Sequence, residues 1–380
     1  IDAMFETVSG FTTTGSSILT DVEALSRCML FWRSFTHWIG GMGVLVFLLA
    51  VIPLSGGSNM NLMRAESPGP SVGKLVPKVK HTARILYLIY LGMTILQVLF
   101  LLAGKLPLFD ALTTTFGTAG TGGFAILNSS CASYSPYLQW VITAFMLLAG
   151  TNFGFFFLLL CRQWRAALRM EEVRWFYIIV FSSTLLIALN LLSSGQFHSV
   201  REVLFQVGTI ITTTGYATTD FDLWPSFSKG ILLFLMLLGA CAGSTGGGIK
   251  VSRLLIYIKT ALREVRQISQ PRVVRTVRLD GKKLEIPVIK GALLFLVCYA
   301  LIFIGSVLII QLENLDLETS FSAVAATLNN IGPGLGLVGP TCNFGFLSPL
   351  SKIVLIFDML AGRLEIFPIL VLLSPRTWKK

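Results

Sequence analysis

The chain is built from long apolar runs that alternate with short polar segments. Each run has about 20 residues, the length that an α-helix needs to cross the hydrocarbon core of a bilayer. The pattern predicts seven membrane spans, at residues 30–54, 83–104, 137–161, 175–194, 226–248, 288–311 and 350–373. This organisation is typical of an all-α membrane protein.

Four shorter segments lie between these spans and are only mildly apolar, at residues 2–14, 108–122, 200–214 and 319–331. They are too short to cross, so we expect re-entrant pore helices, whose irregular ends are tolerated at membrane depth only where protein or water satisfies the backbone. The order span, short helix, turn, span occurs completely three times. The first unit lacks its leading span, and because the chain begins with Ile1 we expect at least one further N-terminal span in the whole protein.

The four short segments align with one another without gaps, and each ends in a polar turn closed by glycine. Repeats define the architecture of a chain, and four copies indicate one site lined four times. We therefore predict pore units at residues 1–54, 83–161, 175–260 and 288–373, separated before the last unit by a cytoplasmic basic loop at 261–287. The predicted fold is a pseudo-fourfold arrangement of span, pore helix, filter and span around a central ion pore.

The turns end as Thr-Thr-Thr-Gly, Gly-Thr-Gly-Gly, Thr-Thr-Thr-Gly and Asn-Asn-Ile-Gly. Glycine can hold backbone conformations that other residues avoid, which lets successive carbonyls point toward one axis. A ring of carbonyls can replace the hydration shell of a monovalent cation. A single TTTG segment would more simply be a helix stop with a polar cap, but four copies in equivalent positions favour ion conduction.

Composition and charge agree with a membrane location. The 380 residues are 54% hydrophobic and 13% charged, and the mean hydropathy is +0.75. Most of the 30 Lys and Arg residues lie in four segments on one side of the predicted spans, at 64–84, 162–174, 250–290 and 376–380. This bias marks the cytoplasmic side, so the net charge of +11 does not indicate nucleic-acid binding.

The opposite side carries a surplus of acidic residues, Asp21, Glu23, Asp220, Asp222, Glu313, Asp316 and Glu318. Such acids can enrich cations near a pore entrance, or they can be ordinary solvated loop residues. The six cysteines are scattered and read as buried apolar residues. The three histidines, His37, His81 and His198, are not grouped, so the sequence assigns no chemistry to them.

The chain resembles the Trk/Ktr/HKT superfamily of cation transporters, and within it the TrkH-type bacterial potassium uptake subunits. The resemblance covers nearly the whole chain and rests on FTTTG at 11–15, TTTGYATTDF at 212–221, GSTGGGIK at 243–250 and LNNIGPGLG at 328–336. The second repeat, GTAGTGGF at 117–124, diverges most, and its register is open by one residue. The resemblance implies a single-chain pseudo-tetramer with a potassium-selective filter. The implied potassium ligands are Thr13, Thr14, Gly15, Thr121, Gly122, Gly123, Thr213, Thr214, Gly215, Asn330, Ile331 and Gly332.

The span at 226–248 degenerates into a glycine-rich segment that a regular helix does not tolerate well. We expect an intramembrane gate beneath the filter, as in the resembling family, formed by Gly239, Gly243, Ser244, Thr245, Gly246, Gly247 and Gly248. A passive kink for close helix packing is the alternative.

The last span carries Asp358, Arg363 and Glu365 within apolar sequence. Charges inside a membrane cost about 2.5–3.5 kcal/mol each on insertion scales, so they are candidates for function. The resemblance implies that Arg363 forms an electrostatic barrier under the filter. The alternative is an ion pair with Glu365 or Asp358 that only locks helices together.

The implied function is potassium uptake through a selective, gated, channel-like pore. The alternative is an ion-coupled secondary carrier, a proton- or sodium-coupled potassium symporter, although carriers usually show two inverted halves. An enzyme is not indicated, because the shared site offers Thr, Asn and Gly instead of a catalytic cluster. Segments 334–339 and 243–252 resemble nucleotide-binding loops, but neither lies in the required strand and helix context.

The resemblance also implies a multi-pass protein of the bacterial inner (plasma) membrane that contacts lipid and forms a homodimer. It further implies a cytosolic nucleotide-binding regulatory subunit of the TrkA type, for which the basic loop is a docking candidate. Anionic lipid would explain the same charges. Potassium is expected as the transported ion, with no covalently bound cofactor.

Overall fold

The computed structural model describes residues 1–42, 79–270 and 276–374. Their fold is helical, apart from one two-stranded hairpin. The predicted span at 30–54 is described only as far as residue 42.

In each of the four units a pore helix is followed by a second helix, and in the second, third and fourth units a long helix precedes the pore helix. The first unit holds α1 (Asp2–Phe11) and α2 (Arg27–Gly41). The second holds α5 (Val79–Ala103), α6 (Leu108–Gly120), α7 (Pro136–Ala149) and α8 (Phe153–Leu160), followed by α9 (Trp164–Leu168). The third holds α10 (Glu171–Ser193), α11 (Val200–Ile211) and α12 (Ser226–Leu238), and the fourth holds α14 (Ile286–Ile310), α15 (Leu317–Leu328), α16 (Pro349–Arg363) and α17 (Phe367–Leu373).

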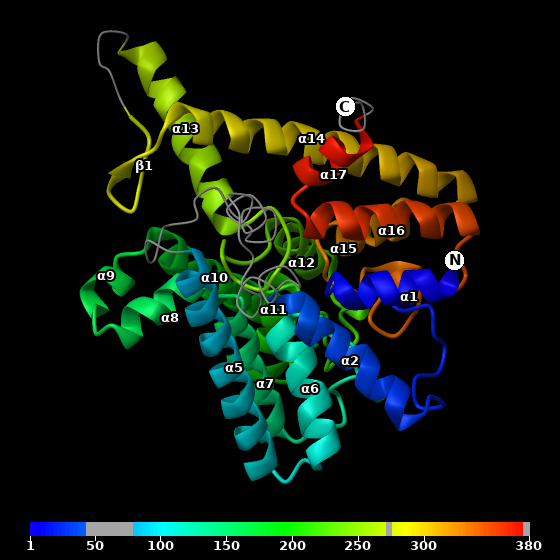
Figure 1. Ribbon diagram of the computed structural model, residues 1–380. Helices are drawn as coiled ribbons and strands as arrows, with labels where there is room; N and C mark the ends of the chain where they lie inside the picture. Colours follow the sequence, from blue (N-terminus) through cyan, green and yellow to red (C-terminus); the bar gives the residue numbers. More distant parts are fainter. Residues whose placement is uncertain (43–78, 271–275, 375–380) are drawn as a thin grey trace.

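The units close into a ring. Within each unit the pore helix packs against the flanking helices. Between units, α2 packs on α6, α7 on α11, α12 on α15, and α16 on α1, so the second helix of every unit contacts the pore helix of the next. Figure 1 shows the last of these contacts, where α16 lies beside α1. This cyclic packing is the predicted pseudo-fourfold arrangement.

The second helices start where the sequence carries a capping serine or a proline. Ser135 accepts a hydrogen bond from the backbone N–H of Leu138, and Ser348 accepts one from Ser351. Each is followed by proline at the first helical position, where the missing N–H has no intrahelical partner. These signals fix where the chain turns back after each filter.

Three predicted spans are interrupted in the structure. The described part of the chain contains three continuous helices that are long and apolar enough to cross a membrane, in α5, α10 and α14. The span at 137–161 is a pair, α7 and α8, bent by 92°. The break begins at Gly150, and Asn152 caps the new helix through the N–H of Gly154.

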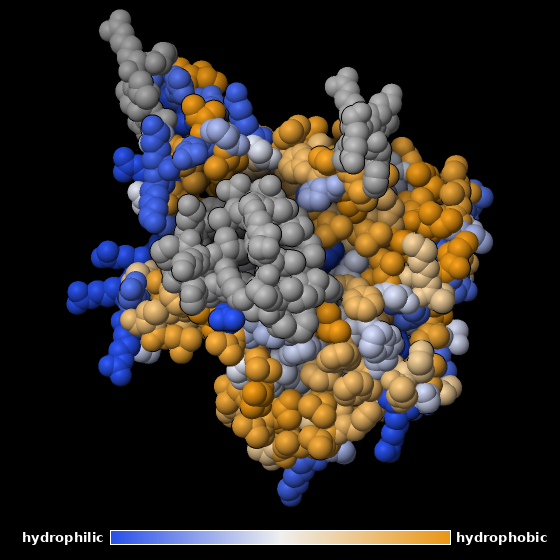
Figure 2. Space-filling view, viewed as in Figure 1, coloured by the Kyte–Doolittle hydropathy of each residue, from blue (hydrophilic) through white to orange (hydrophobic). Residues whose placement is uncertain are grey.

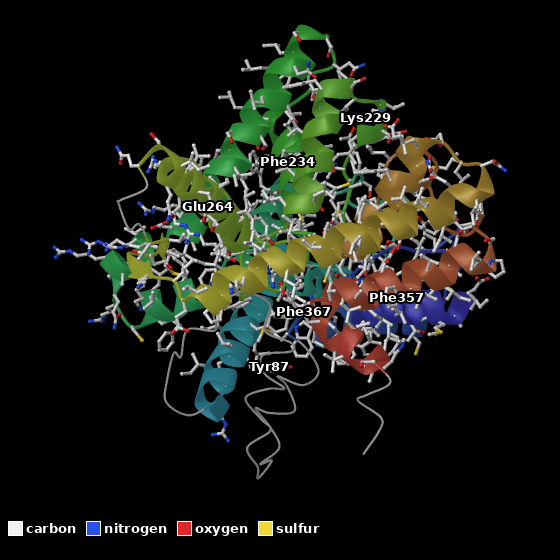
Figure 3. All side chains as sticks on the ribbon, turned by 90° about the horizontal axis from the view of Figure 1, so that it is seen from above. Tyr87, Lys229, Phe234, Glu264, Phe357 and Phe367 are labelled. Carbon is white, nitrogen blue, oxygen red and sulfur yellow. The ribbon has the colours of Figure 1, made fainter. Side chains whose placement is uncertain are left out.

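The span at 350–373 also breaks, between α16 and α17. Glu365 and Ile366 both have positive φ, and Pro368 lies at the start of α17, where it cannot donate to a continuing helix. Phe357 and Phe367 lie on either side of this break (Figure 3). The span at 226–248 is helical only to Leu238, because the glycine-rich segment that follows is irregular.

The predicted basic loop at 261–287 contains the end of α13 (Val251–Ser269) and the hairpin of β1 (Arg278–Leu279) and β2 (Lys282–Lys283). Lys259 on α13 pairs with Glu171, and the Tyr257 hydroxyl donates to the Ala292 carbonyl at 2.9 Å. Figure 2 shows an apolar surface with hydrophilic side chains extending from its edges. Apolar side chains on α5, α10 and α14 are exposed, as expected for helices that face lipid.

Candidate functional site: a four-segment ion filter and its gate

All four pore helices end in the same turn. The residue two positions before the closing glycine is left-handed in every unit, with φ of 55° at Thr13, 52° at Thr121, 57° at Thr213 and 55° at Asn330. The next N–H bonds back to the carbonyl five residues earlier, at 2.9 Å for Thr14 to Ser9 and 2.8 Å in the other three units. This is the Schellman arrangement, which satisfies carbonyls at a helix end.

Threonine is an unfavourable residue for this conformation. A β-branched residue with positive φ is an outlier, and such strain costs about 1–3 kcal/mol per residue and concentrates at functional sites. Three of the four turns hold threonine there. The repeated strain indicates that the turn geometry itself is required.

The closing glycines lie where no side chain fits. Their φ angles are 80° at Gly15, 76° at Gly123, 86° at Gly215 and 104° at Gly332. A Cβ on Gly15 would overlap the carbonyl oxygen of Gly122 in the next unit. The same relation repeats around the ring, from Gly123 to the Thr214 oxygen, from Gly215 to the Ile331 oxygen, and from Gly332 to the Thr14 oxygen at 2.8 Å.

The four turns therefore meet at one place and in cyclic order. Residues far apart in the chain, such as Thr14 and Gly332, are neighbours, and the Ser16 hydroxyl donates to the Gly332 carbonyl at 3.0 Å. The left-handed turn and closing glycine of the second repeat fall at Thr121 and Gly123, in the register of the sequence alignment. The predicted filter residues of all four units are thus brought together.

A cavity of about 180 Å³ lies on one side of this ring and is lined by all four closing glycines. Arg33 also lines it, with its guanidinium 4.0 Å from the ring centre of Phe124 and 3.4 Å from a Glu6 carboxylate oxygen. The arginine is therefore held against the wall by an aromatic ring and an acid. The cavity therefore opens directly onto the four closing glycines.

Hydroxyl and amide groups support the ring from behind. Thr12 and Thr14 share a hydrogen bond of 2.8 Å between their hydroxyls, and Thr212 and Thr214 repeat it at the same distance. The Asn330 amide donates to the Thr14 hydroxyl and to the Met359 carbonyl, both at 2.9 Å. The Thr hydroxyls and the Asn330 amide nitrogen are thus engaged with neighbouring groups, while the Asn330 Oδ1 is buried without a hydrogen-bond partner.

The predicted gate loop touches the ring directly. The N–H of Gly247 donates to the Thr213 hydroxyl at 2.7 Å. A Cβ on Gly246 would lie 2.8 Å from the Thr212 carbonyl oxygen, and one on Gly247 would overlap that of Asn329. Gly239, Gly243 and Gly248 have positive φ, between 68° and 80°. The loop therefore lies against the third and fourth filter segments.

Arg363 ties the same loop to the first unit. Its guanidinium donates to the Thr13 hydroxyl at 3.2 Å, to the Thr245 carbonyl at 2.8 Å, and to the carbonyls of Gly40 and Gly41 at the end of α2. Arg363 thus lies beneath the filter.

The two acids of the same predicted span bind other residues. Glu365 pairs with Arg253, and Asp358 accepts from the Ser306 hydroxyl at 2.8 Å.

Two buried groups at the gate were not singled out from the sequence. Glu172, only 5% exposed, accepts hydrogen bonds from the N–H of Ala242 at 2.5 Å and of Ser252 at 3.1 Å, at the two ends of the gate loop. Lys250 donates to the Gly246 carbonyl. An acid in the first turn of a helix usually interacts with the helix dipole, so no local pattern indicates this second role.

The acidic residues of the outer side have structural partners. Asp316 caps α15 through the N–H of Thr319 at 2.9 Å, and hydrogen bonds from Thr319 lower the pKa of its carboxyl. Asp21 accepts from the Asn128 amide at 2.8 Å, which lowers its pKa. Asp222 lies 3.6 Å from Lys229. The lowered pKa values keep Asp316 and Asp21 negatively charged, and local enrichment of cations stays a prediction.

Other site chemistry finds no support in the described residues. They contain no group of three or more His, Cys, Asp and Glu side chains placed to hold a metal ion. The six cysteines are free, and the expectation that they are buried is met by Cys131 and Cys241 but is wrong for the exposed Cys28, Cys161 and Cys342.

Comparison with known proteins gives one consistent result. The family model described as "TrkH: Cation transport protein" matches residues 1–380. The chain is 38% identical over 386 residues to the Trk system potassium uptake protein TrkH of Escherichia coli K12, covering all of this chain and 80% of the relative. It is 39% identical over 392 residues to TrkH of Vibrio parahaemolyticus, covering 79% of that protein.

The crystal structure of the potassium transporter TrkH from Vibrio parahaemolyticus is also similar. The TM-score is 0.85 at 35% sequence identity, over 100% of this chain and 79% of the solved one.

Proposed function

Because the chain belongs to the TrkH family of cation transport proteins, we propose that it takes up potassium through a selective, gated pore whose filter is the four-segment ring. The family consists of membrane transporters and not of enzymes. The observation that carries the proposal is the cyclic contact between each closing glycine and the carbonyl of the next unit.

Potassium is the proposed transported ion, since the relatives are named as potassium uptake proteins. The carbonyls of Thr14, Gly122, Thr214 and Ile331 line the ring and replace the water that the ion loses on entry. The four pore helices end at the ring, so the negative ends of their dipoles favour a cation there.

The gate loop and Arg363 close the path beneath the filter. The loop is bonded to Thr213 above it, to Arg363 beside it, and to Glu172 at both ends. Opening requires it to leave these partners. The glycines of the loop can adopt many backbone conformations, so the movement causes little backbone strain. In the closed state the positive charge of Arg363 repels a cation.

A channel-like pore is favoured over alternating access. The four units run in the same direction around one axis and share one site, whereas carriers are usually built from two inverted halves. Coupling to protons or sodium is the property that separates the two mechanisms in an experiment.

The proposed setting is the bacterial inner membrane, with a homodimer in the lipid and a cytosolic nucleotide-binding partner. The relatives are named as parts of a Trk system. Helix α13 begins where the gate loop ends and extends to Ser269 beside the basic hairpin. A partner that moves α13 would therefore pull directly on the loop.

Flux through vesicles that contain the purified protein tests the proposal. We expect rubidium uptake, which potassium should inhibit strongly and sodium and lithium only weakly. The uptake should not depend on an imposed proton or sodium gradient. Gly215→Ala should abolish selective flux, because the added Cβ overlaps the Ile331 carbonyl. Gly92→Ala is the matched control, since nothing lies within 4 Å of its added Cβ. Equal inhibition by sodium and potassium would refute the selective pore, and accumulation driven by a gradient would favour the carrier.

A further inference from the structure

The second filter segment lacks a side chain that the other three possess. The position before the closing glycine is Thr14, Thr214 or Ile331 in the other units, and all three are buried behind the ring. In the second unit it is Gly122. Its φ is not among the positive values, so the backbone conformation does not explain the glycine.

The imidazole of His37 fills this space. A Cβ built on Gly122 would overlap Cγ, Nδ1 and Cδ2 of the His37 ring. His37 lies on α2 of the first unit and is completely buried. Its backbone carbonyl also lies against Gly120, where a Cβ would overlap it. The two glycines that make this repeat divergent are therefore those that accommodate His37.

The ring is fixed by hydrogen bonds at both nitrogens. Nδ1 lies 2.8 Å from the carbonyl oxygen of Gly10 in α1, and Nε2 accepts from the N–H of Phe124 at 3.2 Å. A carbonyl only accepts and a backbone N–H only donates, so Nδ1 carries the proton and Nε2 the lone pair. The Phe124 ring packs on the imidazole, with 4.2 Å between centroids.

These contacts join two units of the ring. Gly10 belongs to the first pore helix, and Phe124 directly follows the closing glycine of the second filter segment. The imidazole thus holds the first pore helix and the second filter segment at a fixed distance, and it lies against the backbone at Gly122.

We propose that His37 is a selectivity-determining positioning residue, which supplies from α2 the side chain that the second filter segment lacks at Gly122. The inference rests on the proposed function, since selectivity is meaningful only if the ring conducts. A histidine that merely fills the core would affect folding but not the preference between ions.

The test measures rubidium flux and its inhibition by sodium in vesicles. His37→Leu removes both hydrogen bonds but keeps an apolar side chain. We expect about a tenfold loss of the preference for potassium over sodium, equivalent to about 1.4 kcal/mol, because the second filter segment is no longer held at a fixed distance from the first pore helix. His37→Gln offers one donor and one acceptor, so this variant should retain most of the preference for potassium over sodium. Unchanged selectivity in His37→Leu would overturn the inference.

A second arm leaves His37 in place and covers the case in which His37→Leu does not fold. Gly122→Ala should lose selectivity, because its added Cβ overlaps the His37 imidazole. If Gly122→Ala behaves like the Gly92→Ala control, the inference is wrong.

Absence of potassium-selective flux in the unchanged protein would refute the proposed function itself. That outcome is distinct from failure of the His37 inference, in which the unchanged protein is selective and the variants remain so.

Discussion

Replacing Thr213 with valine tests whether a single hydrogen bond holds the gate loop against the filter. The Thr213 hydroxyl accepts from the N–H of Gly247 at 2.7 Å, and both groups are buried. Valine keeps the shape, the β-branch and the backbone carbonyl of threonine. The substitution therefore removes this hydrogen bond between loop and filter and keeps the backbone of the ring.

The expected effect follows from the unpaired N–H. Leaving a buried donor without a partner costs about 1–3 kcal/mol, and this cost falls on the closed state only, because an open loop exposes Gly247 to water. Since about 1.4 kcal/mol corresponds to a factor of ten, the equilibrium shifts toward the open state by roughly 5- to 150-fold. Basal potassium flux should rise by a similar factor until the pore is open most of the time.

The assay is rubidium efflux from vesicles without any regulatory partner. Thr213→Ser keeps the hydroxyl and should behave like the unchanged protein. Thr121→Val is the matched control in the second unit, where the hydroxyl bonds to the Gly120 carbonyl at 2.7 Å instead of to the gate. If Thr213→Val shows unchanged basal flux, or if Thr121→Val raises flux equally, the hydrogen bond does not hold the gate closed.

Three further perturbations address the gate. Arg363→Ala should raise potassium flux on the order of tenfold, as expected for removing a like charge from a partly screened path; lower or equal flux from a well-inserted variant would count against the barrier. Deletion of residues 243–248 should leave flux that no longer responds to regulation, and a response equal to that of the intact protein would exclude the loop as the gate. Glu172→Ala leaves the N–H groups of Ala242 and Ser252 unpaired, so basal flux should rise with unchanged selectivity. Glu202→Ala serves as its control, since the Glu202 carboxylate lies 3.5 Å from the neighbouring Arg201, and equal flux in the two variants would remove the special role of Glu172.

Much of the fold could be predicted because repeats and apolar runs are local signals. The closing glycines at 15, 123, 215 and 332 follow helices of similar length, so their equivalent positions could be predicted from the alignment. The cyclic packing follows from the repeat, since one site lined four times requires the four turns to meet.

The breaks within spans were harder to predict. The run at 137–161 is apolar throughout, and only Gly150 and Asn152 mark the bend of 92°. The run at 350–373 breaks at Glu365 and Ile366, where Pro368 is the sole local signal. A hydropathy profile shows the length and apolarity of a run, but it does not show where the helix in that run bends.

The roles of Glu172 and His37 could not be predicted from the sequence. Both depend on partners far away in the chain, such as Ser252 for the carboxylate and Phe124 for the imidazole. A lone histidine in an apolar helix is usually a core residue. The proposed role of His37 follows only from its position against Gly122, where the other three filter segments carry a side chain.

The most direct test of the account locates the ion. A crystal structure with rubidium or thallium in place of potassium would reveal bound ions by their anomalous scattering. The account predicts density on the axis of the ring, in contact with the carbonyl oxygens of Thr14, Gly122, Thr214 and Ile331. Ions bound elsewhere, with the ring empty, would contradict it.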